Sequence, residues 1–326
     1  MLSKMLNKYK GCMLGLALGD ALGAAVEFMS YPEIKNKYGE HGIEDLDEWR
    51  GFEAGSYTDD TQMALATAIG CIEAAEEWKK DGIFEPTPYI YKEYLRWLET
   101  QADPFHRRAP GNTCLSALES GDMGSIDAPI NDSKGCGGVM RVAPVGLVFS
   151  GELAFLEGAK SAAITHGHPS GYLSAGFLAE LVSHILDEKT LEESIQLSRK
   201  TLITYNGHEE TLMNINLAEE LAKKEVPVTE AIQEIGEGWV GEEALAIAAY
   251  CSLKFPDDFR AGVTASVNHS GDSDSTGAIT GAILGTLLGK DAIPEGWIEK
   301  LENSQKIEDL AEVMYRIFKE QPSEWL

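Results

Sequence analysis

The sequence is poor in positive charge. Its 326 residues include 27 lysines and arginines against 53 aspartates and glutamates, which gives a formal net charge of −26. A surface with this balance repels phosphate backbones, so we do not expect a nucleic-acid partner. The acidic excess favours no other partner by itself, because it also serves solubility.

Cysteines are few, and their spacing forms no motif. The five stand at positions 12, 71, 114, 136 and 251, and no two of them have CxxC spacing. An odd number of scattered cysteines in a long chain is typical of reduced thiols. The pattern predicts a cytoplasmic protein with neither a disulfide framework nor a zinc site.

Long apolar runs are also missing. The longest, near residues 11–19 and 277–288, are shorter than the roughly 20 residues that a membrane span requires. The first residues lack the signal-peptide order of a basic region, an apolar block and a small-residue cleavage site. We therefore expect neither membrane association nor secretion.

Alternating runs of β-branched residues, the pattern of half-buried strands, are nearly absent. Helical periodicity dominates instead, and 44% of the residues are hydrophobic, enough for a packed core. The pattern predicts an all-α fold, a single domain over residues 1–326 that packs many helices into one bundle. Helices are expected at residues 5–25, 59–80, 88–101, 112–120, 138–149, 152–165, 171–188, 191–205, 209–224, 241–254, 257–268, 275–289 and 305–319.

Glycine, by contrast, is abundant for a helical protein, with 33 residues. Two sets recur every four residues, so each set lies on one face of its helix. A stripe without side chains lets two backbones approach closely, or lets a ligand lie against the helix. In either case we expect both terminal helices to be central to the fold. The sets are Gly11, Gly15, Gly19 and Gly23, and Gly277, Gly281, Gly285 and Gly289.

Two acidic clusters open predicted helices. Each alone is explained by helix capping and by the attraction of carboxylates to the helix dipole. If the two helix starts meet, however, four carboxylates converge, and they repel one another unless a cation neutralises them. Oxygen ligands select Mg²⁺, Mn²⁺ or Ca²⁺ over zinc, and so many carboxylates suit two ions, which can orient a diol or activate a water. The clusters are Thr58, Asp59 and Asp60, and Asp272, Asp274 and Ser275.

Two further features are candidates for the same site. Asp20 and Glu27 are seven residues apart on an otherwise apolar helix, which places both at an edge or facing a cleft. The glycine-rich stretch "SKGCGGVMRVAPVGL", residues 133–147, offers backbone N–H groups that can hold phosphate.

Three histidines are less specific. His166 and His168 in "ITHGHPSGY" have poor spacing for zinc, and one of them is expected to stack on a ligand or cap a helix C-terminus. His269, beside the second acidic cluster, either supports the ligands or fills space as a polar residue.

Six stretches in this order resemble the ADP-ribosylglycohydrolase family, over about residues 10–289. They read "GCMLGLALGDALGAAVEF", "YTDDTQMALA", "GNTCLSAL", "GCGGVMRVAPVGL", "THGHPSGYLSAG" and "HSGDSDSTGAITGAILG". The resemblance implies an all-α domain with two Mg²⁺ or Mn²⁺ ions. It also implies a hydrolase that cleaves the glycosidic bond between ADP-ribose and an arginine or serine side chain, or a small molecule, and releases ADP-ribose.

The resemblance also implies roles for individual residues. Glu27 and Asp60 would be catalytic and handle the proton of the attacking water. Serine at position 275 keeps the hydroxyl of the threonine that the family usually has there. The implied metal ligands are Thr58, Asp59, Asp60, Asp272, Asp274 and Ser275. The implied substrate-binding residues are Asn112, Gly137, Gly138, Met140 and His166.

One position departs from the family pattern. The nitrogenase-regulating branch has an aspartate three residues before the asparagine that matches Asn112, and this chain has Ala109 there. Glu27 or Asp103 would then have to replace that carboxylate. Two other functions compete with the hydrolase: a nucleotide phosphohydrolase, and an ADP-ribose-binding protein with little activity.

Overall fold

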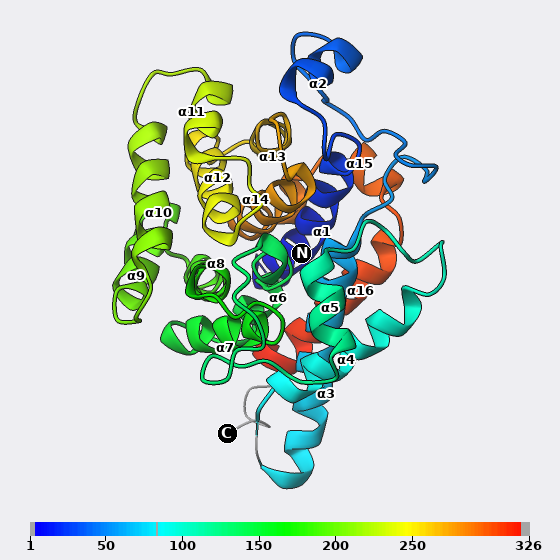
Figure 1. Cartoon of the computed structure of the whole chain (residues 1–326), viewed down its shortest axis with the longest axis vertical. Helices are drawn as coiled ribbons and strands as arrows, with labels where there is room; N and C mark the ends of the chain where they lie inside the picture. Colours follow the sequence, from blue (N-terminus) through cyan, green and yellow to red (C-terminus); the bar gives the residue numbers. More distant parts are fainter. Residues whose placement is uncertain (1–3, 83, 321–326) are drawn as a thin grey trace.

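The all-α prediction is confirmed. The computed structural model describes residues 4–82 and 84–320, and those residues form helices and connecting loops without a β-strand (Figure 1). The α-helices are α1 (Lys4–Gly23), α2 (Tyr31–Tyr38), α3 (Asp59–Asp81), α4 (Thr87–Thr100), α5 (Asn112–Glu119), α6 (Ala143–Val148), α7 (Glu152–Ala163), α8 (Pro169–Leu186), α9 (Leu191–Leu202), α10 (Glu209–Ala222), α11 (Val228–Ile235), α12 (Gly241–Lys254), α13 (Phe259–Val267), α14 (Ser273–Leu288), α15 (Glu295–Lys300) and α16 (Ser304–Tyr315). Three short helical segments of other types are the 3₁₀-helices η1 (Cys136–Gly138) and η2 (Lys290–Ala292) and the π-helix η3 (Arg316–Glu320).

Helices α1 and α14 form the centre of the molecule, where blue and orange ribbons lie side by side (Figure 1). Their backbones touch along the two glycine stripes. A Cβ atom at Gly15 would collide with the carbonyl oxygen of Gly281, and one at Gly19 with that of Gly277. The stripes therefore serve close helix packing and not the binding of a ligand along the helix.

We expect Gly19→Ala to lower the free energy of unfolding by about 2 kcal/mol or more. The added methyl group meets backbone atoms, which cannot rotate away, and this overpacking outweighs the better helix propensity of alanine. Gly296→Ala is the matched control, because Gly296 lies in α15 with nothing within 4 Å of an added Cβ. Urea unfolding of both variants measures the difference, and equal midpoints would contradict the close packing at Gly19.

The antiparallel pairing of α1 and α14 decides where the second acidic cluster lies. Gly11 packs against Gly285 at one end, and Gly23 packs against Ser273 at the other. The start of α14, with Asp272 and Asp274, is therefore held beside the last turn of α1. Two segments at opposite ends of the chain are brought together in this way.

Some predicted boundaries were wrong. The expected helix over 138–149 is only α6, because residues 139–142 form a turn after η1. Three short helices, α2, α11 and α15, were not expected. Helix α2 has a clear start signal, since Glu33 accepts a hydrogen bond from the backbone N–H of Ser30.

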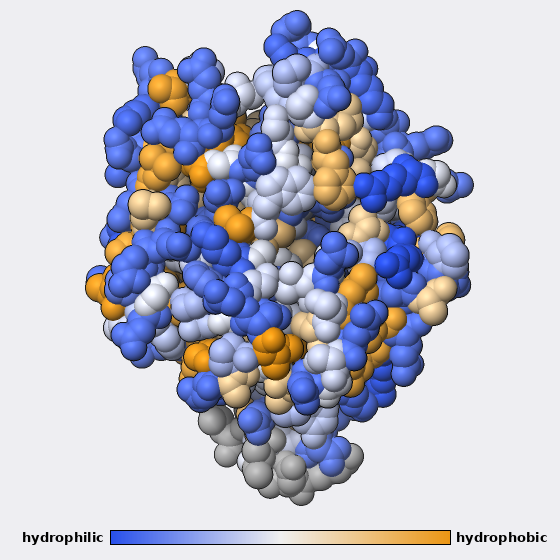
Figure 2. All heavy atoms as spheres, in the orientation of Figure 1, coloured by the Kyte–Doolittle hydropathy of each residue, from blue (hydrophilic) through white to orange (hydrophobic). Residues whose placement is uncertain are grey.

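Most of the face in Figure 2 is hydrophilic, and apolar residues occur there singly or in small groups. Among the described residues, none of the helices is both long and apolar enough to cross a membrane. The five cysteines are free thiols, and four of them are buried.

Candidate active site

A cavity of about 330 Å³ lies where the starts of α3, α5 and α14 meet the turn after α1. Two loops complete its wall, one before α6 and one before α12. The lining residues are Glu27, Phe28, Asp59, Asp60, Ala109, Pro110, Gly111, Asn112, Thr113, Cys114, Gly135, Cys136, Gly137, Met140, His166, Trp239, Asp272, Asp274 and Ser275.

Ten of the twelve residues predicted for the site line this cavity, and both acidic clusters are among them. Thr58 and Gly138 do not. Thr58 is fully buried as the N-cap of α3, where its side chain accepts a hydrogen bond from the backbone N–H of Asp60. Gly138 is packed against Ala162. Both residues shape the backbone behind the wall.

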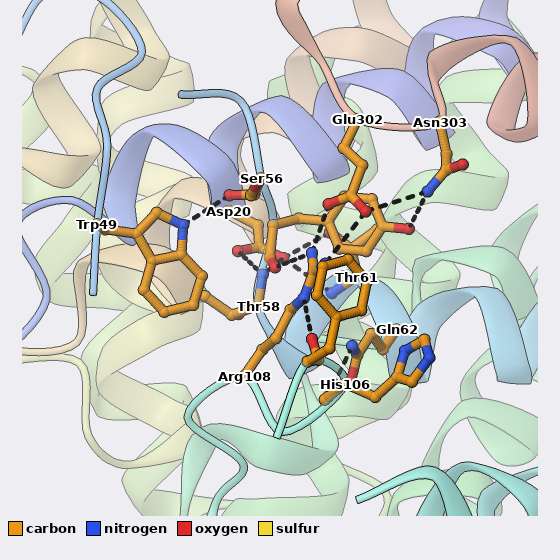
Figure 3. Close-up of polar contacts among 12 residues, drawn as sticks. Asp20, Trp49, Ser56, Thr58, Thr61, Gln62, His106, Arg108, Glu302 and Asn303 are labelled. Atoms are coloured by element: carbon orange, nitrogen blue, oxygen red, sulfur yellow. Dashed lines mark hydrogen bonds and ion pairs between the residues drawn. The ribbon is translucent and has the colours of Figure 1, made fainter. Parts of the chain in front are cut away.

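Asp20 fixes the start of α3 from the side of α1 (Figure 3). Its carboxylate is fully buried and accepts hydrogen bonds from the backbone N–H of Thr58 at 2.9 and 3.1 Å. It also accepts from the backbone N–H of Thr61 at 2.9 Å and from its hydroxyl at 2.5 Å. The prediction that Asp20 lies at an edge or in a cleft was therefore wrong.

Arg108 fixes the same segment from the opposite side (Figure 3). Its carbonyl oxygen accepts the N–H of Asp59 at 3.2 Å, and its guanidinium donates to the carbonyl oxygen of Tyr57 at 3.1 Å. The guanidinium is 2% exposed, is paired with Glu302, and lies within 5.5 Å of the Tyr57 ring centre. Sequence reasoning missed Arg108, because no local pattern distinguishes it from a surface arginine.

Four carboxyl groups of the cavity have pKa values raised far above their ordinary range. Burial, followed by the charges of Asp272 and Asp59, raises the pKa of Glu27 to about 9. Burial is also the main cause that raises the pKa of Asp59, Asp60 and Asp274 well above the ordinary range of aspartate. Without a compensating positive charge, these groups hold protons or repel one another.

Three of these carboxylates each have an unsatisfied oxygen. Oε2 of Glu27, Oδ2 of Asp60 and Oδ1 of Asp274 are buried and have no hydrogen-bond partner among the described residues. Leaving a buried charged oxygen without a partner is costly. Unpartnered carboxylate oxygens are the donors that hard cations prefer, so the donor chemistry fits Mg²⁺ or Mn²⁺.

The carboxylates are not already gathered around one point. Within residues 4–82 and 84–320, no three acidic, histidine or cysteine side chains are placed to hold one ion together. Asp272 is engaged elsewhere, since Oδ2 accepts from the thiol of Cys136 at 2.8 Å and Oδ1 accepts from the N–H of Ser275 at 3.2 Å. Both oxygens of Asp272 therefore have a hydrogen-bond partner before any cation binds.

Glu27 belongs to a turn and not to helix α1, which ends at Gly23. The backbone N–H of Glu27 still bonds to the carbonyl of Gly23 at 2.9 Å, so the helical path continues for one turn. Phe28 then reverses the chain with a φ of 67°, a conformation unusual for a bulky residue. Glu27 lines the cavity, so of the two positions that the sequence left open, an edge or a cleft, it occupies the cleft.

Phe28 and Trp239 form an aromatic pair at the cavity that the sequence did not reveal. Their rings stack at 5.2 Å, and they are 57% and 37% exposed. The carbonyl of Trp239 accepts the N–H of Cys136 at 3.1 Å, which joins the loop before α12 to the glycine-rich loop. In the sequence, Trp239 is marked only by the two glycines before it, Gly236 and Gly238.

The histidines have separate positions. His166 lines the cavity. His168 caps a helix N-terminus and not a C-terminus, because its Nδ1 accepts the N–H of Ser170 in α8 at 3.1 Å. His269 is buried outside the lining, with Nε2 hydrogen-bonded to the hydroxyl of Thr276 at 2.9 Å.

Ala109 lies in the cavity wall, in a left-handed conformation with φ of 57°. Asp103, considered as a replacement for the missing carboxylate, is exposed and does not line the cavity. Glu27 does line it, so of the two it is the one positioned to act on a ligand.

Comparison with known proteins gives the same family along the whole chain. The model of the ADP-ribosylglycohydrolase family matches residues 1–324. An uncharacterized protein of Archaeoglobus fulgidus is 31% identical over 96% of this chain and 97% of its own. The ADP-ribosyl-[dinitrogen reductase] glycohydrolase of Rhodospirillum rubrum is 28% identical over 90% and 89%. A solved ADP-ribosylglycohydrolase-related protein complex superposes with a TM-score of 0.72 at 28% identity, over 97% of this chain and 99% of that one. This chain therefore belongs to the ADP-ribosylglycohydrolase family.

Proposed function

We propose that this protein is a metal-dependent hydrolase that removes ADP-ribose from a modified arginine or serine side chain, or from a small molecule. The observation that supports this most is the set of three unpartnered carboxylate oxygens, on Glu27, Asp60 and Asp274, at one cavity. A binding pocket for an anionic nucleotide would not gather carboxylates unless cations accompany the ligand.

The residues that would hold the cations come from both acidic clusters. Asp59 and Asp60 stand at the start of α3, and Asp272, Asp274 and Ser275 at the start of α14. Thr58 would contribute only through its backbone position, since it does not line the cavity. Mg²⁺ or Mn²⁺ at this place supplies positive charge to orient the ribose diol and to polarise the sugar.

The reaction breaks the bond between the anomeric carbon of the distal ribose and the nitrogen or oxygen of the side chain. A water oxygen bonds to that carbon, and the leaving group receives a proton. In this proposal Glu27 holds and moves the protons, and Asp60 lines the same cavity. Neutralising Asp272 and Asp59 would lower the pKa of Glu27 from about 9 toward a range in which it accepts a proton from water.

The proposal is tested by mass spectrometry of the products. Peptides carrying ADP-ribose on arginine or on serine are incubated with the protein and Mg²⁺, Mn²⁺ or a chelator. We expect free ADP-ribose and unmodified peptide with at least one linkage, and no product with the chelator. Release of AMP would indicate a phosphohydrolase instead, and tight binding without any product would indicate an ADP-ribose-binding protein.

A further inference from the structure

Arg141 is a buried cation without an anionic partner. It lies between η1 and α6 and is fully buried, and within the described part of the chain its Nη1 contacts only the sulfur atoms of Met63 and Cys114 and no carboxylate. Its guanidinium lies 4.2 Å from the ring centre of Tyr94 and donates to the carbonyl oxygen of Ser161 at 3.4 Å. A buried charge that is not compensated within the fold is costly, so this arginine requires a further explanation.

The guanidinium is connected to the cavity through Thr165. Nη2 of Arg141 donates to Oγ1 of Thr165 at 2.7 Å, and the same oxygen is 2.8 Å from Nδ1 of His166. Because arginine only donates, Thr165 is the acceptor in the first bond. Its own hydroxyl hydrogen then has Nδ1 of His166 as its only acceptor among the described residues. Nδ1 therefore accepts, and the ring hydrogen of His166 is on Nε2.

The ring of His166 is neutral, and its free edge faces the ligand cavity. Burial, with the charge of Arg141 as the second cause, lowers the pKa of His166 to about 3. The residue is 1% exposed and lines the cavity, and its Nε2 has no hydrogen-bond partner in the described part of the chain. Nε2 is thus a donor at the cavity wall without an acceptor in the described part of the chain.

Glycine at positions 135 and 137 keeps this donor accessible. A Cβ at Gly137 would lie 2.9 Å from Cε1 and 3.1 Å from Nε2 of His166, and one at Gly135 would lie 3.4 Å from Nε2. Side chains at these positions would cover the nitrogen. The sequence feature that suggested phosphate binding therefore also leaves the histidine edge open.

The family resemblance already implies that His166 contacts the substrate. We propose that Arg141 and Thr165 position it, in a hydrogen-bonded relay that presents Nε2–H of His166 to an anionic oxygen of the ligand. The identification of that oxygen as a phosphate oxygen of ADP-ribose rests on the proposed function. Arg141 and Thr165 act as positioning residues: they fix the tautomer of His166 and align the hydroxyl and N–H dipoles toward the cavity. The buried positive charge lies behind the donor, which favours an anionic acceptor over a neutral one.

The tautomer is measured first, in the protein without ligand. In protein labelled with ¹⁵N on histidine, two-bond ¹H–¹⁵N correlation spectra distinguish Nε2–H from Nδ1–H, and His166→Gln assigns the signal. We expect Nε2–H in the wild type and in Thr165→Ser, which keeps the hydroxyl. Thr165→Val, which has the same shape without it, is expected to give a mixture of tautomers. A wild-type His166 protonated on Nδ1, or an unchanged spectrum in Thr165→Val, overturns the relay.

Binding is measured next, by calorimetry with Mg²⁺ present. We expect Thr165→Val to weaken ADP-ribose and AMP about threefold or more, because part of His166 then carries its hydrogen on Nδ1 and the aligned chain of dipoles is broken. Thr165→Ser, which keeps the hydroxyl, should stay within about twofold of the wild type. Adenosine, which lacks phosphate, should bind all three proteins equally. Equal weakening of adenosine would indicate general damage to the cavity and contradict an anion-specific role.

The outcomes separate this inference from the proposed function. AMP binding that depends on Thr165, without any release of ADP-ribose from peptides, would reject the hydrolase and leave the relay intact. If Thr165→Val releases ADP-ribose with the KM and kcat of the wild type, the relay is rejected and the hydrolase proposal stands.

Discussion

Asp274→Asn is expected to lower turnover by at least about a thousandfold while the fold survives. The substitution removes a charge and changes little volume, at a carboxylate with one unpartnered buried oxygen in the cavity. Loss of a ligand that holds a catalytic cation removes several kcal/mol of charge stabilisation in the transition state. Turnover on ADP-ribosylated peptide and circular dichroism would be measured on the same sample.

The same variant has an expected effect on stability that a damaged protein would not show. Burial, then Glu27 and Asp60, raises the pKa of Asp274 in the folded protein. The protonated carboxyl therefore stabilises the fold below the ordinary aspartate pKa of about 4, and this stabilisation is lost as pH rises through the folded-state value. With chelator present at pH 8, we expect Asp274→Asn to have a higher melting temperature than the wild type. At pH 5 this difference in melting temperature should be smaller.

Two other aspartates provide controls for this result. Asp20→Asn makes the same chemical change at a buried position, but there it places an amide against the N–H groups of Thr58 and Thr61. We expect a loss of about 3 kcal/mol in the free energy of unfolding, because buried donors lose a charged acceptor. Asp257→Asn, at an exposed loop position, should change neither turnover nor the free energy of unfolding. Near-normal turnover by Asp274→Asn would rule out the ligand role.

Glu27→Gln is expected to lower kcat at least about a hundredfold and to leave the affinity for ADP-ribose within a few-fold. An amide keeps the shape of the side chain but cannot take a proton, and removal of a general base typically costs 10²–10⁴ in rate. The raised pKa of about 9 and the position in the cavity distinguish this glutamate from an exposed one. Calorimetry with ADP-ribose and steady-state kinetics separate binding from chemistry.

Glu40→Gln is the matched control for Glu27→Gln, because Glu40 is exposed and pairs with Lys35 at the surface. Glu40→Gln should lower the free energy of unfolding by about a few tenths of a kcal/mol at most and leave kcat unaltered. If Glu27→Gln keeps kcat within threefold of the wild type, Glu27 is a structural residue. Proton transfer would then have to be assigned to Asp60.

The sequence predicts the centre of this fold well, because local spacing determines it. Glycines at every fourth position leave no side chain on one helix face, and two such faces can approach to backbone contact. The contact extends along both helices and has the same form at each glycine pair, from Gly11 with Gly285 to Gly19 with Gly277: an added Cβ would meet the carbonyl oxygen of the facing glycine. It also explains why the two acidic clusters, far apart in the sequence, line one cavity.

The rest of the site depends on contacts that no local pattern encodes. Arg108 and Arg141 have the same residue type but opposite surroundings: Arg108 is paired with Glu302, and Arg141 has only neutral partners among the described residues. Thr58 and Gly138 stand inside functional motifs, yet they serve the backbone behind the cavity wall. A motif therefore predicts which segment of the chain forms a site. It predicts less well which residues of that segment line the cavity.

Binding of cations between the two acidic clusters is tested most directly by a crystal structure with saturating Mn²⁺, using the anomalous signal of the metal. The account predicts two peaks within about 4 Å of each other in the cavity, between the carboxylates at the start of α3 and those at the start of α14. It also predicts that Asp272 has released the thiol of Cys136 to contact a peak. A cavity without a peak, or Mn²⁺ bound only elsewhere on the protein, would contradict it.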